Sequence, residues 1–388
     1  MEYLNSWMDY PSKMAEPRSH LIYAYRGDGA RRILSSAMDG RILGVYFIGS
    51  TETSTIPGVS VAGATPELTL YTPAVDVEYL FYGRPLTIDQ IPVTPEGIPT
   101  PALITRAAIR SSNIPFIVVD TGSYVKPRIP HVTLPSRMIG GRVDLGEALP
   151  YDVARSLFEE GRALARVFTH LTELMILGES IPGGTTTALG ILVGLGYDAW
   201  GMVSSASPSN PHVLKEKIVR EGLERMGGPS VDPFEAVARL GDPVHVSMAG
   251  FLAGALEGDA SIILGGGTQM AAVLAIIKHI GISLKGRVMI GTTRWLIEDD
   301  SSDLIGLVEM IQPDVPVVAY DIDFSKSPYE GLRYYERGYV KEGVGAGGTS
   351  IVAATIKGLT HERLLSAIYE EYERLRGDGV EVDEEDRG

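Results

Sequence analysis

Short, nearly uninterrupted runs of apolar residues alternate with longer amphipathic segments along most of the chain. The runs have the length of strands, and their lack of polar alternation is typical of strands buried on both faces of a sheet. They cover residues 42–48, 116–119, 174–177, 261–264, 287–290 and 315–320. Apolar residues at helical spacing predict helices at 31–38, 74–81, 101–111, 151–169, 188–195, 211–225, 233–240, 244–256, 270–277, 349–356 and 360–376.

This alternation predicts an α/β fold with a doubly wound, mostly parallel, Rossmann-like sheet. Two long segments lack a regular pattern. Residues 50–73 are rich in Thr, Gly and Pro, which favours a functional loop, and residues 120–149 are predicted to be an irregular crossing segment. Ligands of such folds bind beyond the carboxyl ends of the strands, so the turns after the strands are the places to search for a site.

Three glycine-rich turns open predicted helices, at residues 183–187, 265–268 and 342–348. The first reads Gly183-Gly184-Thr185-Thr186-Thr187, and the second begins Gly265-Gly266-Gly267. Glycine lets the backbone approach a ligand, and a helix N-terminus offers free N–H groups and a positive dipole end, so a phosphate is the expected guest. No Lys follows the glycines, unlike in an ATP-binding P-loop. Any single turn of this kind can serve tight packing alone, whereas three can converge on one pocket.

Composition narrows the class of protein. The chain has 388 residues, 44% of them hydrophobic, and no apolar stretch near the roughly 18–20 residues that span a bilayer. The N-terminus lacks a signal-peptide pattern, and the absence of Cys excludes disulfides and thiolate metal sites, so a cytoplasmic protein is expected. The formal net charge of −15 argues against nucleic acid as a partner, because phosphate backbones need a basic surface.

Two carboxylates, Glu179 and Glu342, stand next to glycine turns. Each could simply cap backbone N–H groups or pair with an Arg. Alternatively, each could do acid–base work in a partly dry cleft, where burial raises the pKa of a carboxyl group toward neutrality.

Other candidate chemistry is weaker. The seven His residues show no metal-ligand spacing, and no GxSxG elbow is present to anchor a hydrolase triad. Asp321 and Asp323 end a predicted strand and could bind a metal or a ribose hydroxyl, or simply be solvated. The Ser204-Ser205-Ala206-Ser207 segment could offer hydroxyls to a ligand, although the sequence favours a plain loop there. No cofactor and no metal are expected.

Taken in order, several of these segments resemble the nicotinate-nucleotide:dimethylbenzimidazole phosphoribosyltransferase family, which assembles the nucleotide loop of cobalamin, and specifically its archaeal branch. The resemblance runs from about residue 40 to 375. It is carried by Gly178-Glu179-Ser180-Ile181-Pro182-Gly183-Gly184-Thr185-Thr186, Val246-Ser247-Met248-Ala249-Gly250, Ile263-Leu264-Gly265-Gly266-Gly267 and Glu342-Gly343-Val344-Gly345-Ala346. The stretch from Thr55 to Thr69 looks like the archaeal branch in particular.

The resemblance implies phosphoribosyl transfer from nicotinate mononucleotide to a benzimidazole-type base, with release of nicotinate, inversion at C1′ and formation of an α-ribazole phosphate. It implies Glu342 as the catalytic base and makes Glu179 a candidate to stabilise positive charge near C1′. The nucleotide and its phosphate would be held by Gly183, Gly184, Thr185, Thr186, Gly265, Gly266, Gly267, Gly343 and Gly345. It also implies a homodimer. The implied domains are a helical subdomain from residues 1–40 and 357–376, an α/β catalytic domain at 41–356, and an acidic disordered tail at 377–388.

The chain departs from the bacterial members, which have Asn where this chain has Gly184 and an Asp near the turn at 265–267. Adenine or a hydroxybenzimidazole therefore remains possible as the acceptor. A non-catalytic mononucleotide-binding protein on the same fold is the alternative function. A dinucleotide-dependent oxidoreductase is a third reading, but residues 49–58 lack its GxGxxG motif.

Overall fold

The computed structural model describes residues 20–38, 40–63, 65–88 and 97–377. The strands are β1 (Leu21–Tyr25), β2 (Ile42–Gly49), β3 (Phe116–Gly122), β4 (Val132–Thr133), β5 (Leu174–Ser180), β6 (Ser261–Gly265), β7 (Val288–Thr293) and β8 (Val317–Tyr320). Within the described residues they form one sheet in the order β1-β8-β7-β6-β5-β2-β3-β4. Every neighbouring pair is parallel except β1 with β8.

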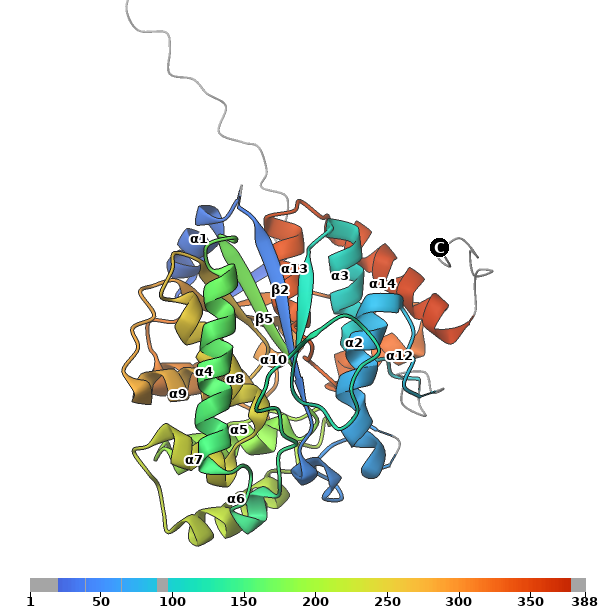
Figure 1. The fold of residues 1–388 in the computed structure, drawn as a ribbon. Coiled ribbons are helices and arrows are strands. Elements are labelled where there is room, and N and C mark those ends of the chain that lie inside the picture. The colour runs from blue at the N-terminus through green and yellow to red at the C-terminus, as the bar shows by residue number, and fades with distance from the viewer. Residues whose placement is uncertain (1–19, 39, 64, 89–96, 378–388) are drawn as a thin grey trace, which may run out of the picture.

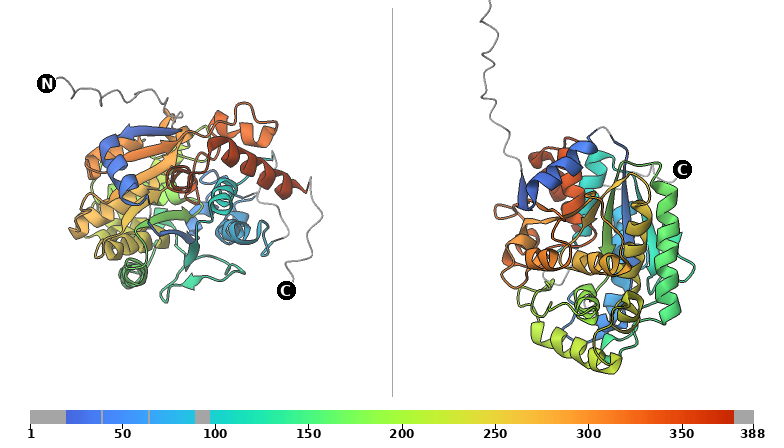
Figure 2. Two further views of the ribbon diagram at one scale, coloured as in Figure 1. Left: turned by 90° about the horizontal axis from the view of Figure 1, so that it is seen from above. Right: turned by 90° about the vertical axis from the view of Figure 1, so that its left-hand side faces the viewer.

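Helices pack on both faces of this sheet (Figures 1 and 2). The helices are α1 (Gly27–Ser36), α2 (Thr72–Tyr82), α3 (Ala102–Ser112), α4 (Tyr151–Phe168), α5 (Gly184–Gly194), α6 (His212–Met226), α7 (Pro233–Leu240), α8 (Pro243–Ala255), α9 (Gln269–Ile280), α10 (Arg294–Ile297), α11 (Leu304–Ile311), α12 (Glu330–Arg333), α13 (Ala346–Thr355) and α14 (His361–Arg376). Short 3₁₀ turns add η1 (Glu52–Thr55), η2 (Glu67–Tyr71), η3 (Val143–Leu145) and η4 (Tyr335–Arg337). The predicted α/β fold with a mostly parallel sheet is therefore confirmed.

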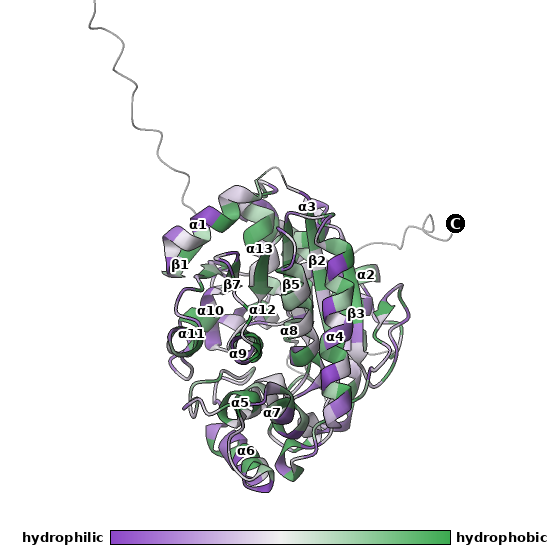
Figure 3. Ribbon diagram, turned by 60° about the vertical axis from the view of Figure 1, so that its left-hand side comes forward, coloured by the Kyte–Doolittle hydropathy of each residue, from purple (hydrophilic) through white to green (hydrophobic). Residues whose placement is uncertain are grey.

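The core consists of two apolar layers, one on each face of the sheet, because side chains alternate along a strand. On β2, Val45 and Phe47 belong to the layer covered by α4, α5, α7, α8 and α9, whereas Tyr46 and Ile48 belong to the layer under α1, α2, α3, α13 and α14. Helix α4, which covers one face of the sheet, is amphipathic and shows both hydrophilic and hydrophobic residues along its length (Figure 3). No helix in the described ranges combines the length and the apolar character that a membrane span requires.

Local sequence explains where several helices begin. Asp232 caps α7 by accepting a hydrogen bond from the Phe234 N–H, and Pro233 occupies the first helical position. Asp242 caps α8 in the same way and is likewise followed by a proline, Pro243. Such caps satisfy backbone donors that the helix itself leaves unpaired.

The first and last described elements, β1 and α14, both pack against the rest of the fold. Residues 21–25 form the antiparallel edge strand β1, which the sequence pattern did not predict, and the predicted helix at 31–38 is α1. Helix α14 is held on α3 by the buried Glu371 carboxylate, which pairs with the Arg106 Nε at 2.9 Å and the Arg110 Nη1 at 2.8 Å. The division into a subdomain from the chain ends and a catalytic domain stays a prediction, and residues 378–388 of the predicted acidic tail lie outside the described residues.

Candidate active site

A cavity of about 660 Å³ lies beyond the carboxyl ends of the central strands, within the range of small-molecule sites. Figure 1 shows α5, α6 and α7 gathered at the lower end of the molecule, the end at which β5 passes into α5. The cavity wall is built from segments far apart in the sequence: 59–63, 98–101, 179–185, 204–206, 267–269 and 339–344, together with residues of α2. The predicted functional loop at 50–73 therefore contributes part of this wall.

Strand β5 places Glu179 in the cavity wall. The strand extends to Ser180, beyond the predicted end at residue 177, so Glu179 belongs to a buried strand rather than to the glycine turn. Its side chain is buried, and Oε1 accepts a hydrogen bond of 2.9 Å from the Gln269 Nε2. Burial, together with the charges of Glu342 and Asp242, raises the pKa of Glu179 well above its ordinary value.

Glu342 lines the same cavity from the loop before α13. Its carboxylate accepts hydrogen bonds from the Gly347 N–H at 3.1 Å and the Gly343 N–H at 3.3 Å, and from the Thr292 hydroxyl at 3.4 Å. Burial outweighs these hydrogen bonds and raises the pKa of Glu342 to about 7. The group is thus poised to gain or lose a proton near neutral pH.

The backbone around Glu342 is strained. Val340, Lys341 and Val344 have φ angles of +66°, +52° and +51°, in the left-handed region that L-residues rarely adopt. For the two β-branched valines this conformation is especially costly, and such outliers persist only where surrounding structure enforces them. Here the Val344 N–H donates to the Glu179 carbonyl and the Val340 N–H donates to the Ala206 carbonyl, so the loop is tied to two other walls of the cavity.

A third carboxyl group, which the sequence analysis did not identify, is Asp76 of α2. It is buried in the cavity wall, where Oδ2 accepts from the Ser180 hydroxyl at 2.6 Å and Oδ1 from the Thr100 hydroxyl at 2.7 Å. Burial raises the pKa of Asp76 to about 6 despite these hydrogen bonds. The available signal was a charged residue inside the apolar stretch Ala74-Val75-Asp76-Val77, since an unpaired carboxylate is rarely buried.

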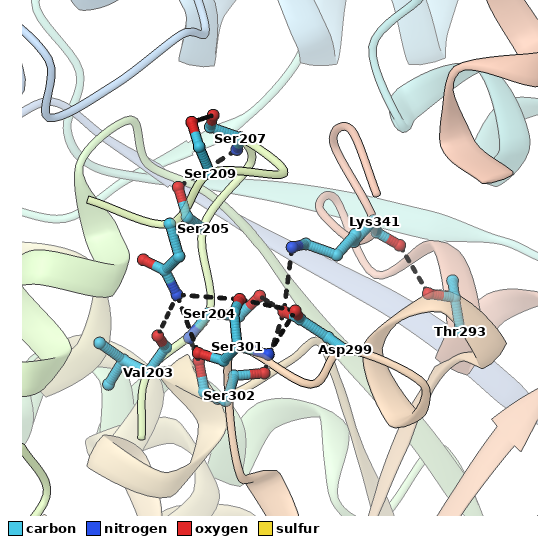
Figure 4. Close-up of polar contacts among 12 residues, drawn as sticks. Val203, Ser204, Ser205, Ser207, Ser209, Thr293, Asp299, Ser301, Ser302 and Lys341 are labelled. Atoms are coloured by element: carbon cyan, nitrogen blue, oxygen red, sulfur yellow. Dashed lines mark hydrogen bonds and ion pairs between the residues drawn. The ribbon is translucent and has the colours of Figure 1, made fainter. Parts of the chain in front are cut away.

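Ser204 and Lys341 line the cavity, and Figure 4 shows them in one polar network with Asp299. Lys215 and Asn210 extend this network outside the described lining of the cavity. We call these five residues, Ser204, Asn210, Lys215, Asp299 and Lys341, the lysine corner. The Lys341 Nζ lies 2.9 Å from the Asp299 Oδ2, which also accepts from the Ser204 hydroxyl at 2.7 Å. The Lys215 Nζ donates to the Ser204 carbonyl at 2.5 Å and to the Asn210 Oδ1 at 2.9 Å.

The lysine corner holds two lysines against one carboxylate. Hydrogen bonds from Ser301 and Ser204 and the Lys341 ammonium hold the pKa of Asp299 at about 2, although burial alone would raise it. Burial, reinforced by the nearby Lys341 charge, lowers the pKa of Lys215 to about 7. Of the described residues that line the cavity, Lys341 is the one Lys or Arg, so its ammonium is the cation that the described wall offers to a ligand.

Some residues of the predicted glycine turns line the cavity and others do not. Gly183, Gly184, Thr185, Gly267 and Gly343 line the cavity, as do Glu179 and Glu342. Thr186, Gly265, Gly266 and Gly345 are not among the described lining residues.

Gly345 shows what such a glycine does instead of lining the wall. It has a φ of +69°, and a Cβ there would lie 3.2 Å from the Cα of Gly178. Close packing of backbone on backbone therefore explains this glycine without a ligand.

The arrangement brings three carboxyl groups with raised pKa values, Asp76, Glu179 and Glu342, to one end of a single cavity. Perturbed carboxyl groups gathered in a cleft are characteristic of catalytic sites, since proton transfer is most efficient when the pKa lies near the working pH. Lys341 offers a buried cation to an anion. No group of three or more His, Asp or Glu within the described ranges has the geometry to hold a metal ion.

Comparison with known proteins gives three findings. Residues 104–285 match a phosphoribosyltransferase family model. The chain is 46% identical to a UPF0284 protein of Aeropyrum pernix over 350 residues, covering 90% of this chain and 97% of that one. It is 50% identical to a UPF0284 protein of Pyrobaculum calidifontis over 328 residues, covering 84% and 94%.

Among solved structures, the fold is similar to the nicotinate-nucleotide-dimethylbenzimidazole phosphoribosyltransferase of Thermus thermophilus. The TM-score is 0.59 at 17% sequence identity, and the match covers 92% of this chain and 93% of that chain. At this identity the likeness establishes a shared fold. The family-model match includes Glu179 and Lys215 but ends before Glu342.

Proposed function

We propose a reaction for this chain on the premise that it belongs to the UPF0284 proteins and to the phosphoribosyltransferase family, whose members are enzymes of the glycosyltransferase type. In the proposed reaction, the phosphoribosyl group of nicotinate mononucleotide passes to a benzimidazole-type or purine base. The C1′–N bond to nicotinate breaks and its electron pair stays on the nicotinate nitrogen, while a ring nitrogen of the acceptor attacks C1′ from the opposite face. The products are nicotinate, a proton and an α-ribazole phosphate for the lower ligand of cobalamin.

The observation that carries this proposal is the buried Glu342 carboxyl, held on a strained loop with a pKa of about 7. The acceptor base is a weak neutral nucleophile until the proton on its second nitrogen is removed. A carboxylate whose pKa lies near neutrality accepts that proton efficiently and can release it again at the end of a cycle. Glu342 is therefore the proposed general base.

Glu179 is proposed to face the C1′ side of the donor. The donor has a positively charged pyridinium ring, and positive charge shifts toward C1′ and the ring oxygen as the bond breaks. A neighbouring carboxylate stabilises that charge most strongly where water is excluded. Because Glu179 is buried, the approach of the cationic donor would itself favour its ionised form.

The lysine corner is proposed to receive the phosphate, and the lining residues of the glycine turns, Gly183, Gly184, Thr185 and Gly267, are proposed to help hold it and to position the ribose. Placing the phosphate there puts the dianion next to Lys341, the cation of the described cavity lining, whose polar network also includes Lys215. Uncompensated buried positive charge is costly, and an anionic ligand would relieve it. The sugar would then span the cavity with C1′ toward Glu179.

The remaining wall suits a flat apolar acceptor. It includes Val59, Val61, Val75 and Ile98, with Glu342 on the facing loop. A benzimidazole-type ring or adenine would fill such a slot while one ring nitrogen reaches the carboxylate. The proposal further places the enzyme in the cytoplasm and makes it a homodimer. Light scattering on the purified chain would test whether it is a dimer.

The deciding experiment measures nicotinate release by the purified full chain. Nicotinate mononucleotide is incubated with dimethylbenzimidazole, 5-hydroxybenzimidazole or adenine, or with no base, and the products are separated chromatographically. We expect nicotinate and an α-ribazole phosphate in equal amounts, formed only when a base is present. If calorimetry shows that the nucleotide binds but no base elicits nicotinate release, the protein is a mononucleotide binder and the proposed reaction is wrong.

A further inference from the structure

Gln269, the first residue of α9, lines the cavity beside Glu179. Its carboxamide Nε2 donates to the Glu179 Oε1 at 2.9 Å. Because the Nε2 of Gln269 donates to the Glu179 carboxyl group, the Oε1 of the same carboxamide points toward Gly184. A Cβ placed on Gly184 would lie only 2.0 Å from the Gln269 Oε1, so the oxygen sits over the bare Cα of that glycine.

The Gln269 Oε1 is buried and has no hydrogen-bond partner among the described residues. This distinguishes it from the Asp76 carboxylate nearby, both of whose oxygens accept from hydroxyl groups. A buried acceptor without a donor is destabilising, and native structures rarely keep one without a reason. Because Gln269, Glu179 and Gly184 all line the cavity, a ligand can supply the missing donor.

The chemistry of the donor nucleotide identifies the group that can do so; this step rests on the proposed function. The phosphate and the nicotinate carboxylate are acceptors once ionised, and the pyridinium nitrogen has no N–H. The ribose hydroxyls remain as donors, and the 2′-hydroxyl is the one adjacent to C1′, where Glu179 is proposed to act. The orphaned oxygen lies on the same wall as Glu179, at the other end of the carboxamide that donates to that carboxyl group.

We propose that Gln269 selects a ribosyl over a 2′-deoxyribosyl donor by accepting a hydrogen bond from the ribose 2′-hydroxyl, while its amide N–H orients the Glu179 carboxyl. Gly184 contributes to the same recognition of the hydroxyl, because any side chain at this position would displace the Gln269 oxygen. A site built to hydrogen-bond a substrate hydroxyl rejects the analogue that lacks it, since its own polar group is then left unpaired.

The test compares kcat/KM for nicotinate mononucleotide and for its 2′-deoxy analogue in the wild type, Gln269→Leu and Gln269→Met. We expect the wild type to prefer the ribosyl donor by about 10–100-fold. Both variants should reduce this preference to within about 3-fold, by losing activity on the ribosyl donor. Gln312→Leu, the same substitution at the end of α11 and outside the described lining of the cavity, is the matched control and should keep the wild-type preference.

Gly184→Ala gives an independent test of the geometry. The added methyl group would push the Gln269 carboxamide aside, so this variant should also lose the preference for the ribosyl donor. A wild type that uses both donors equally, or a Gln269→Leu variant that keeps the preference with a native melting temperature, would overturn the inference.

A binding measurement separates this inference from the proposed reaction. Calorimetry with the two mononucleotides needs no acceptor and no turnover. If the wild type releases no nicotinate but binds the ribosyl form more tightly, and Gln269→Leu abolishes that difference, then the role of Gln269 stands and the proposed reaction falls. If nicotinate is released but neither binding nor kcat/KM distinguishes the two donors, the reaction stands and the role of Gln269 is wrong.

Discussion

Replacing Glu342 by Gln removes a titratable group and changes little else. The amide keeps the shape of the side chain, and its oxygen can still accept from the Gly347 and Gly343 N–H groups that hold the carboxylate. Basicity is lost, because an amide takes no proton in the physiological range. The substitution therefore isolates the proton-accepting role from the positioning of the loop.

The magnitude follows from the pKa of Glu342, which burial raises to about 7 from an ordinary 4.5. If the ionised form is the base, activity rises about tenfold per pH unit below pH 7 and levels off above it. Losing a general base costs about 10²–10⁴-fold in rate. Glu342→Gln should therefore lower kcat/KM by that factor at pH 8 and abolish this rise with pH.

The same pKa difference predicts an effect on stability with a definite sign. Because the folded-state pKa exceeds the unfolded-state one, burial of Glu342 costs nothing below about pH 4.5, where both states are protonated. The cost grows as pH rises to about 7 and is then fully present, at about 3 kcal/mol. Glu342→Gln should thus raise the melting temperature at pH 8 and leave it nearly unchanged at pH 5.

The assay measures nicotinate release between pH 5 and 9, together with melting temperatures at pH 5 and pH 8. Glu309→Gln, an exposed substitution on α11, is the control and should resemble the wild type in both. An active Glu342→Gln variant with an unchanged pH profile would refute the assignment of Glu342 as the base. A melting temperature of Glu342→Gln below that of the wild type at pH 8 would refute the inference that burying the ionised Glu342 carboxylate destabilises the folded protein.

Three further outcomes are expected. Lys215→Met should raise KM for nicotinate mononucleotide by about 10–100-fold through loss of a positive charge from the lysine corner, whereas Lys217→Met, exposed on the same helix, should leave it unchanged in initial-rate assays. Glu371→Gln leaves the buried Arg106 without its carboxylate and should lower the free energy of unfolding in urea by about 3 kcal/mol. Gly345→Ala, at a φ of +69° and against the Gly178 backbone, should destabilise by about 1–3 kcal/mol, measured in the same way.

Much of the fold could be predicted because its signals are local. The run at 42–48 is apolar on both faces, which predicts a central strand, and β2 lies between β3 and β5 in the sheet. The helix predicted at 151–169 coincides with α4 within one residue. The sequence pattern did not predict strand β1 because an edge strand is only half buried and its apolar run is short, ending before Arg26.

The sequence predicted two carboxylates of the candidate site, but it did not predict other polar side chains in and around the cavity. Glu179 and Glu342 stand beside glycines in recognisable motifs, and the structure brings both into one cavity. Gln269 and Lys215 lie on helices with nothing in their local sequence to mark them. Their importance arises from what faces them: a carboxyl group 2.9 Å away in one case, and the Ser204 carbonyl in the other.

The sequence by itself determined the alternation of strands and helices, and the positions of the glycine-rich turns, because burial pattern and backbone freedom are properties of neighbouring residues. Only the tertiary structure decided which glycines face the cavity, as Gly184 does, and which pack backbone on backbone, as Gly345 does. The tertiary structure also decided the pKa values of the ionisable groups in and around the cavity. The pKa values of Glu342 and Lys215 meet near 7 because burial disfavours the charged form of each, and burial is created by elements that are distant in the chain.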